Sequence, residues 1–225
     1  MELLKDNILD TMLVHSGTWE RVPLPERFAF KFEVEFGWGP ETSIFPDAAK
    51  KLWQGRLDVP GRILSVEKLW NTFGQQIIDQ QDRSCEFQLT THRGTESGKW
   101  MGPSQVRRES LIFEVEGSID DVLKLTVDGE VYELPVRQIL QGTRIYAQYS
   151  QSEQHITEKF GPTPHYRDDL IWHCAFKFRV RRGVPASAYT LHHTQLLDLE
   201  QGSQYRLRVW LKNGDAAWVS PFFCR

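Results

Sequence analysis

The chain has 225 residues, of which 40% are hydrophobic and 25% are charged, and its formal net charge is −3. This composition is typical of a soluble globular protein, and the weak negative charge argues against nucleic-acid binding, for which a basic domain is expected. No apolar run reaches the roughly 18 to 20 residues that span a bilayer, and the N-terminus lacks the pattern of a signal peptide. The widely spaced Cys85, Cys174 and Cys224 predict free thiols in a cytoplasmic protein.

Alternation of apolar and polar residues predicts strands through the first half of the chain. In residues 28–36, every second residue is Phe or Val, which is typical of a half-buried strand. Residues 53–59 and 62–70 flank Pro60-Gly61, and this arrangement predicts a hairpin. A further strand is expected at residues 85–89.

The second half repeats this pattern. Residues 122–127 and 131–136 flank Asp128-Gly129, a pair that tolerates positive φ, so a hairpin with a type I′ turn is expected. Strands are also expected at the ranges 111–115, 144–149, 172–180 and 189–199. The polar residues 150–169 predict the longest loop.

These elements amount to about a dozen strands without an amphipathic helix of three turns. Antiparallel pairing follows, because parallel strands need crossover helices. The expected fold is therefore all-β, a single antiparallel β-sandwich over residues 1–225. A closed barrel, or two small sandwiches divided near residues 103–108, are lesser options.

Two tryptophans lie in turn-like sequence and are candidate ligand-binding residues. Trp38 stands between glycines, and Trp100 precedes Met101-Gly102-Pro103. Tryptophan rings exposed on the loops of a sandwich can stack on sugars. They can equally close the ends of the core, and this is the more ordinary interpretation.

The polar loop supplies a second candidate binding cluster, formed by His165, Arg167 and Asp168. A metal-dependent hydrolase would add His92, Asp169 and His173 from elsewhere in the chain. The sequence has no His-x-His, no His-Glu-x-x-His and no Cys-x-x-Cys, so we expect no metal or other cofactor. A solvated loop is the simpler interpretation of the cluster.

Basic residues share one face of a predicted strand, at Lys177, Arg179 and Arg181. If this strand neighbours the last long strand, which has a similar basic face, the resulting stripe could meet an anion or an acidic partner. Cross-strand pairing with outward carboxylates such as Glu33 and Glu35 is the favoured interpretation. The same alternation places Arg206, Arg208 and Lys212 on one face of the last long strand.

Residues 204–211 and 217–219 predict a closing hairpin around Asn213-Gly214. The segments 205–209 and 215–223, which include Ala-Trp-Val-Ser-Pro, resemble the closing hairpin of DUF3604-type proteins, in which the C-terminal region follows a PHP-like metal-dependent hydrolase domain. The resemblance implies a β-sandwich accessory region without the catalytic part. It carries over no functional residue.

The leading functional hypothesis is therefore a non-catalytic accessory or binding domain, whose partner could be a protein or a carbohydrate. A carbohydrate-binding module is the first alternative. A metal-dependent hydrolase with a site assembled from distant residues is the second.

Overall fold

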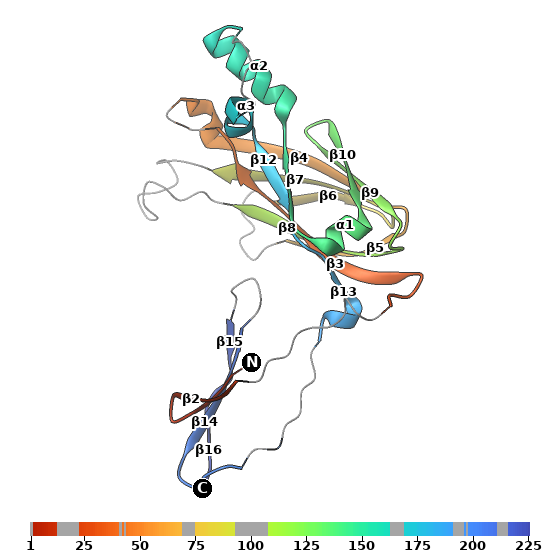
Figure 1. The fold of residues 1–225 in the computed structure, drawn as a ribbon. Helices are drawn as coiled ribbons and strands as arrows, with labels where there is room; N and C mark the ends of the chain where they lie inside the picture. Colours follow the sequence, from red (N-terminus) through yellow and green to blue (C-terminus); the bar gives the residue numbers. More distant parts are fainter. Residues whose placement is uncertain are drawn as a thin grey trace. The chain divides into compact units, whose positions relative to one another are not determined.

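The computed structural model describes residues 2–12, 23–40, 42, 44–68, 75–92, 108–162, 169–190, 196, 198–210 and 216–225 (Figure 1). The chain divides into two compact units, the larger over residues 24–189 and the smaller over residues 1–23 and 190–225. These boundaries differ from the division that was considered near residues 103–108. In the described part of the chain all strand pairs are antiparallel and no sheet closes into a barrel, which confirms the predicted all-β fold.

The first sheet of the larger unit has the strand order β11-β12-β3-β8-β5, with β13 also paired to β3. Its central strand β3 buries every second side chain because apolar residues alternate with charged ones. We call it the six-stranded sheet. Its strands are β3 (Phe28–Trp38), β5 (Arg62–Lys68), β8 (Glu109–Gly117), β11 (Arg144–Ala147), β12 (Lys177–Val180) and β13 (Val184–Pro185).

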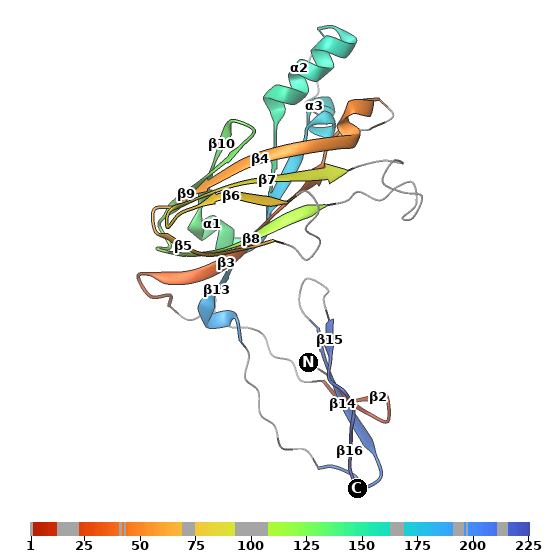
Figure 2. The same ribbon diagram turned by 180° about the vertical axis from the view of Figure 1, so that it is seen from behind.

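The second sheet of the larger unit has the order β10-β9-β4-β7-β6, and Figure 2 shows β4, β7 and β6 side by side. The predicted turn between β9 and β10 is confirmed, because Asp128 and Gly129 have φ values of 50° and 89°. We call this the five-stranded sheet. Its strands are β4 (Lys50–Asp58), β6 (Gln76–Gln80), β7 (Ser84–His92), β9 (Val122–Val127) and β10 (Glu130–Pro135).

Aromatic rings join the two sheets into a sandwich. The Phe36 ring on β3 lies 5.1 Å from the Trp53 ring on β4, and Phe87 on β7 lies 5.9 Å from Phe113 on β8. All four side chains are buried. Each stabilises the fold by about 2–3 kcal/mol relative to exposure, so this aromatic layer contributes substantially to the larger unit's stability.

The predicted hairpin at Pro60-Gly61 is wrong. β4 pairs with β7 and β9, whereas β5 pairs with β8, so the turn carries the chain from one sheet to the other. A Cβ on Gly61 would lie 1.9 Å from the Glu116 carbonyl oxygen. The corner is therefore tight enough to require glycine.

Helices replace part of the predicted loop and strands. α2 spans residues that were expected to form a loop. The sequence did not indicate this helix, because its apolar periodicity is weak and it buries only Ser152 and Ile156. α3 replaces the start of the strand expected at 172–180. No described helix is both long and apolar enough to cross a bilayer. The helices are α1 (Val136–Gln141), α2 (Tyr149–Phe160), α3 (Asp169–Cys174) and the 3₁₀ turns η2 (Pro46–Ala49) and η4 (Ala186–Ala188).

The smaller unit is one sheet built from both ends of the chain, in the order β15-β14-β1-β2 with β16 paired to β14. The pairing of β14 with β15 confirms the closing hairpin, whose turn at Asn213-Gly214 lies outside the described residues. Its buried side chains include Leu3 and Tyr205, while Trp218 and Phe223 are exposed. Its strands are β1 (Glu2–Lys5), β2 (Ile8–Met12), β14 (Gln204–Trp210), β15 (Ala216–Trp218) and β16 (Phe222–Phe223).

Candidate anion-binding site

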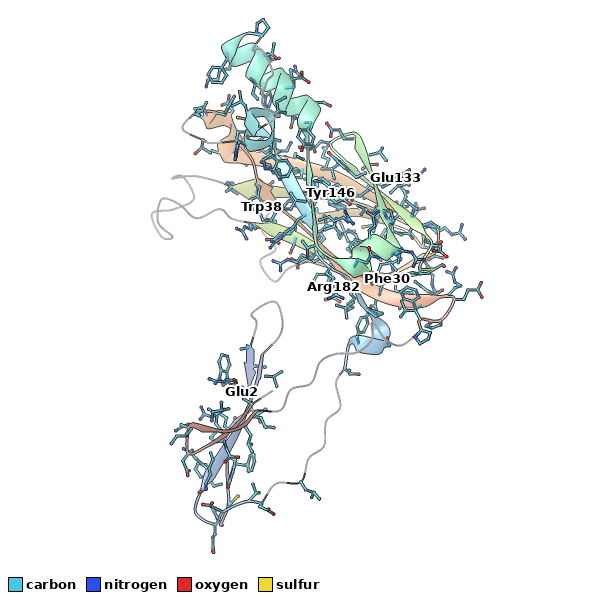
Figure 3. The ribbon with its side chains drawn as sticks, viewed as in Figure 1. Glu2, Phe30, Trp38, Glu133, Tyr146 and Arg182 are labelled. Atoms are coloured by element: carbon cyan, nitrogen blue, oxygen red, sulfur yellow. The ribbon has the colours of Figure 1, made fainter. Side chains whose placement is uncertain are left out.

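A bulge turns Trp38 away from the core. Uninterrupted alternation would place Trp38 on the same face as Phe36. The register instead shifts, so that Phe36 pairs with Phe178 whereas Trp38 pairs with Lys177. The extra residue is Gly37, whose φ of 137° favours glycine. Trp38, at the end of β3 in Figure 3, therefore lies with the charged side chains of the outer face.

Three arginines meet at one buried carboxylate on this face. Glu35 is 5% exposed and accepts hydrogen bonds from Arg179 at 2.6 Å and from Arg181 at 3.0 Å, both to Oε2. Arg108, which precedes β8, approaches its Oε1 to 3.6 Å. We call Trp38, Glu35 and these arginines the Trp38 arginine cluster. Strands on both sides of β3 thus deliver guanidinium groups to the same point.

The Trp38 ring holds two of these guanidinium groups in place. The central carbon of Arg108 lies 4.8 Å from the ring centroid and that of Arg179 lies 5.0 Å away. Cation–π attraction stabilises each contact by about 0.5–1 kcal/mol. A neutral sugar that stacked on Trp38 would have to compete with these groups, so the ring is better suited to positioning the arginines.

The favoured pairing of basic and acidic strand faces is confirmed. Arg181 contacts Glu33 at 3.1 Å in addition to Glu35. Among the described side chains at this end of the face, the three arginines contact two carboxylates, so a positive surplus remains there. Arg108 was not identified from the sequence, because it precedes β8 and only the three-dimensional structure shows that its side chain reaches Glu35.

A second set of polar contacts in the larger unit, around Asp128, has a structural role. The Lys51 ammonium contacts Asp128 at 2.8 Å and lies 4.8 Å and 4.6 Å from the Trp53 and Phe176 ring centroids. Gln148 donates to the same carboxylate at 3.0 Å. This arrangement ties the β9–β10 turn to the start of α2.

Most of the remaining sequence-predicted site residues lie outside the described residues. These are Trp100, His165, Arg167 and Asp168. Of the hydrolase candidates, His92 ends β7, Asp169 begins α3 and His173 lies on α3. Within the described ranges, no group of three or more His, Cys, Asp or Glu side chains is placed to hold a metal ion.

The buried thiols are poor nucleophiles. Burial, with lesser effects from Asp79 and Glu86, raises the pKa of Cys85 to about 11. Burial likewise raises the pKa of Cys174. Because the thiolate is the reactive form, both buried side chains serve packing.

Comparison with known proteins provides no relative from which to transfer a function. No protein-family model, curated protein or solved structure matches the chain.

Proposed function

We propose that this chain is a non-catalytic binding module whose larger unit recognises an acidic partner protein at the Trp38 arginine cluster. The observation that supports the proposal is the convergence of Arg108, Arg179 and Arg181 on a buried glutamate beside an outward-turned tryptophan. At another point on the outer face the charges balance, because Lys31 contacts the Glu67 carboxylate at 2.7 Å.

The geometry suits recognition because the guanidinium groups are held before a partner arrives. Arginine forms planar, charge-assisted hydrogen bonds with carboxylates. Ordering flexible side chains on binding costs about 0.5–1.5 kcal/mol for each. The ion pairs to Glu35 and the Trp38 ring reduce that cost, and the partly exposed Arg181 and Arg108, at 37% and 48%, keep faces open to solvent.

Binding to fluorescent poly-L-glutamate, followed by anisotropy at low and physiological ionic strength, tests the proposal. We expect wild-type chain to bind in a salt-dependent way and the double variant Arg108→Gln/Arg181→Gln to bind at least about tenfold more weakly. Arg56→Gln is the matched control, because Arg56 is 43% exposed and contacts Asp58 and Glu86 on the five-stranded sheet. Equal loss in both variants, or no binding by wild type, would refute the proposal.

The accessory role implied by the DUF3604 resemblance is part of this proposal, as is a cytoplasmic location, which the three free thiols support. The carbohydrate-binding and metal-hydrolase alternatives stay predictions. A glycan array tests the first, and metal analysis of the purified protein tests the second. If the purified protein contained a stoichiometric divalent metal ion and hydrolysed a phosphoester, the proposal of a binding module would be wrong and the protein would be an enzyme.

A further inference from the structure

We infer that the Trp38 arginine cluster contains a discrete oxyanion site at Arg108, beside Arg179, whose guanidinium group also contacts the Trp38 ring. This inference rests on the proposed function and specifies its ligand chemistry. The bound group is a single carboxylate or phosphate, held by guanidinium hydrogen bonds. Binding does not depend on the diffuse positive field of the strand face.

Arg108 is the available donor of the cluster. A guanidinium group has five N–H donors, yet within the described part of the chain the contacts of Arg108 are an ion pair at 3.6 Å to Glu35 and the Trp38 ring. Neither contact is a hydrogen bond, because 3.6 Å exceeds the usual donor–acceptor distance. Charge and ring thus orient the group, and no described residue takes up its N–H donors, which leaves them open to a ligand.

A buried hydroxyl beside the carboxylate is a second, independent observation. Ser110 pairs directly with Glu35 in the strand register, so the two side chains leave neighbouring strands on the same face. Its Oγ is buried and has no hydrogen-bond partner. An unsatisfied buried hydroxyl is unfavourable. When a ligand oxyanion draws the arginines partly away from Glu35, the Ser110 hydroxyl can donate a hydrogen bond to that carboxylate.

Glu35 is a positioning residue in this site. Its carboxylate holds Arg179 through both Nε and Nη2 at 2.6 Å, which directs that guanidinium plane towards Trp38. Glu35 does not have to leave the arginines or lose its charge when the ligand binds. Among the described side chains, three arginines contact Glu33 and Glu35, so a positive surplus remains for the ligand. The oxyanion therefore shares the guanidinium groups with Glu35 and does not replace it.

Titration of the ¹⁵N-labelled 225-residue chain with sodium acetate and with inorganic phosphate, at constant ionic strength, tests the site. The Trp38 indole N–H and arginine Nε–H signals should shift and saturate. Affinity should fall about tenfold in Arg108→Gln and about threefold in Ser110→Ala, where one weaker hydrogen bond is lost, with no change in Arg56→Gln. Saturation by acetate alone identifies a carboxylate ligand, and saturation by phosphate alone identifies a phosphorylated one.

The outcomes separate this inference from the proposed function. Non-saturating shifts that are equal in wild type and Arg108→Gln overturn the oxyanion site. If poly-L-glutamate still binds and still depends on the arginines, the proposed function survives that result. If neither small anions nor poly-L-glutamate bind, both proposals fail.

Discussion

Replacing Glu35 by glutamine tests how strongly the arginine cluster depends on its buried carboxylate. The side chain of Glu35 is 7% exposed, and those of Arg179 and Arg181 are 24% and 37% exposed. Removing one partner of a fully buried ion pair costs about 3–5 kcal/mol. Solvent screening of the exposed guanidinium groups reduces this value, so we expect Glu35→Gln to lower the free energy of unfolding by about 2–3 kcal/mol.

Urea denaturation followed by circular dichroism measures this loss, and thermal denaturation provides a second reading. For a domain of roughly 150–250 residues, 1 kcal/mol corresponds to about 2–4 °C, so the melting temperature should fall by about 5–10 °C. Glu33→Gln is the matched control, since the Glu33 side chain is 25% exposed and pairs with Arg181. It should cost less than about 1 kcal/mol. Equal losses in the two variants would refute the view that Glu35 organises the cluster.

Three further predictions concern the core and the sheet corner. Trp53→Phe removes the 2.8 Å hydrogen bond to the Thr91 hydroxyl and leaves a cavity, so it should lower the free energy of unfolding in urea by about 2–4 kcal/mol. Gly61→Ala should destabilise the fold by about 3 kcal/mol, because its Cβ would lie 1.9 Å from the Glu116 carbonyl oxygen. Gly142→Ala is the control and should change stability by less than about 0.5 kcal/mol, because a Cβ there meets nothing within 4 Å. Equal effects of the two substitutions would contradict the corner assignment. The free energy of unfolding should also fall as pH rises from 9.0 to about 11, because Cys85 has its ordinary pKa of 9.0 when unfolded but a pKa of about 11 when folded. This loss should be on the order of 2 kcal/mol over that pH range. It should be absent in Cys85→Ala, as measured by urea titrations at each pH.

The strands that alternate most regularly were predictable from the sequence. Residues 28–36 and 111–115 have apolar residues at every second position, and both form central strands of the six-stranded sheet. Asp128-Gly129 was equally clear, because few dipeptides accept positive φ at both positions. These features are local, and local sequence determines them.

The errors arose where tertiary contacts decide the outcome. A Pro-Gly turn between two strands looks the same whether the strands pair or enter different sheets, so Pro60-Gly61 was misassigned. α2 buries too few apolar residues to show helical periodicity, although residues 149–160 lack Gly and Pro and are followed by Gly161, which has a φ of 79°. That glycine was the signal for a helix end.

The candidate site was predictable only in part. Pairing of Arg179 and Arg181 with Glu33 and Glu35 followed from alternation, because charged side chains on adjacent strands of an antiparallel sheet meet across the ladder. The position of Trp38 did not follow, since the bulge at Gly37 reverses its face. A one-residue irregularity therefore separates a core tryptophan from one that positions arginines.

Glu35 should set the affinity of the site as well as its stability. Its carboxylate competes with a ligand for the same guanidinium groups, so Glu35→Gln removes an opposing charge at the point of binding. At a separation of about 6 Å in a mixed protein and water environment, this charge is worth about 1 kcal/mol, which is about a fivefold change in affinity. We therefore expect the variant to bind poly-L-glutamate about fivefold more tightly, although it unfolds at a lower urea concentration. Binding is measured without urea and below the melting temperature, where the variant is folded. Glu33→Gln should show a smaller gain, because Glu33 contacts Arg181 and lies farther along β3 from Arg108. Weaker binding by a Glu35→Gln variant that is still folded would mean that the carboxylate is needed to orient the arginines more than it opposes the ligand, and the competition argument would then be wrong.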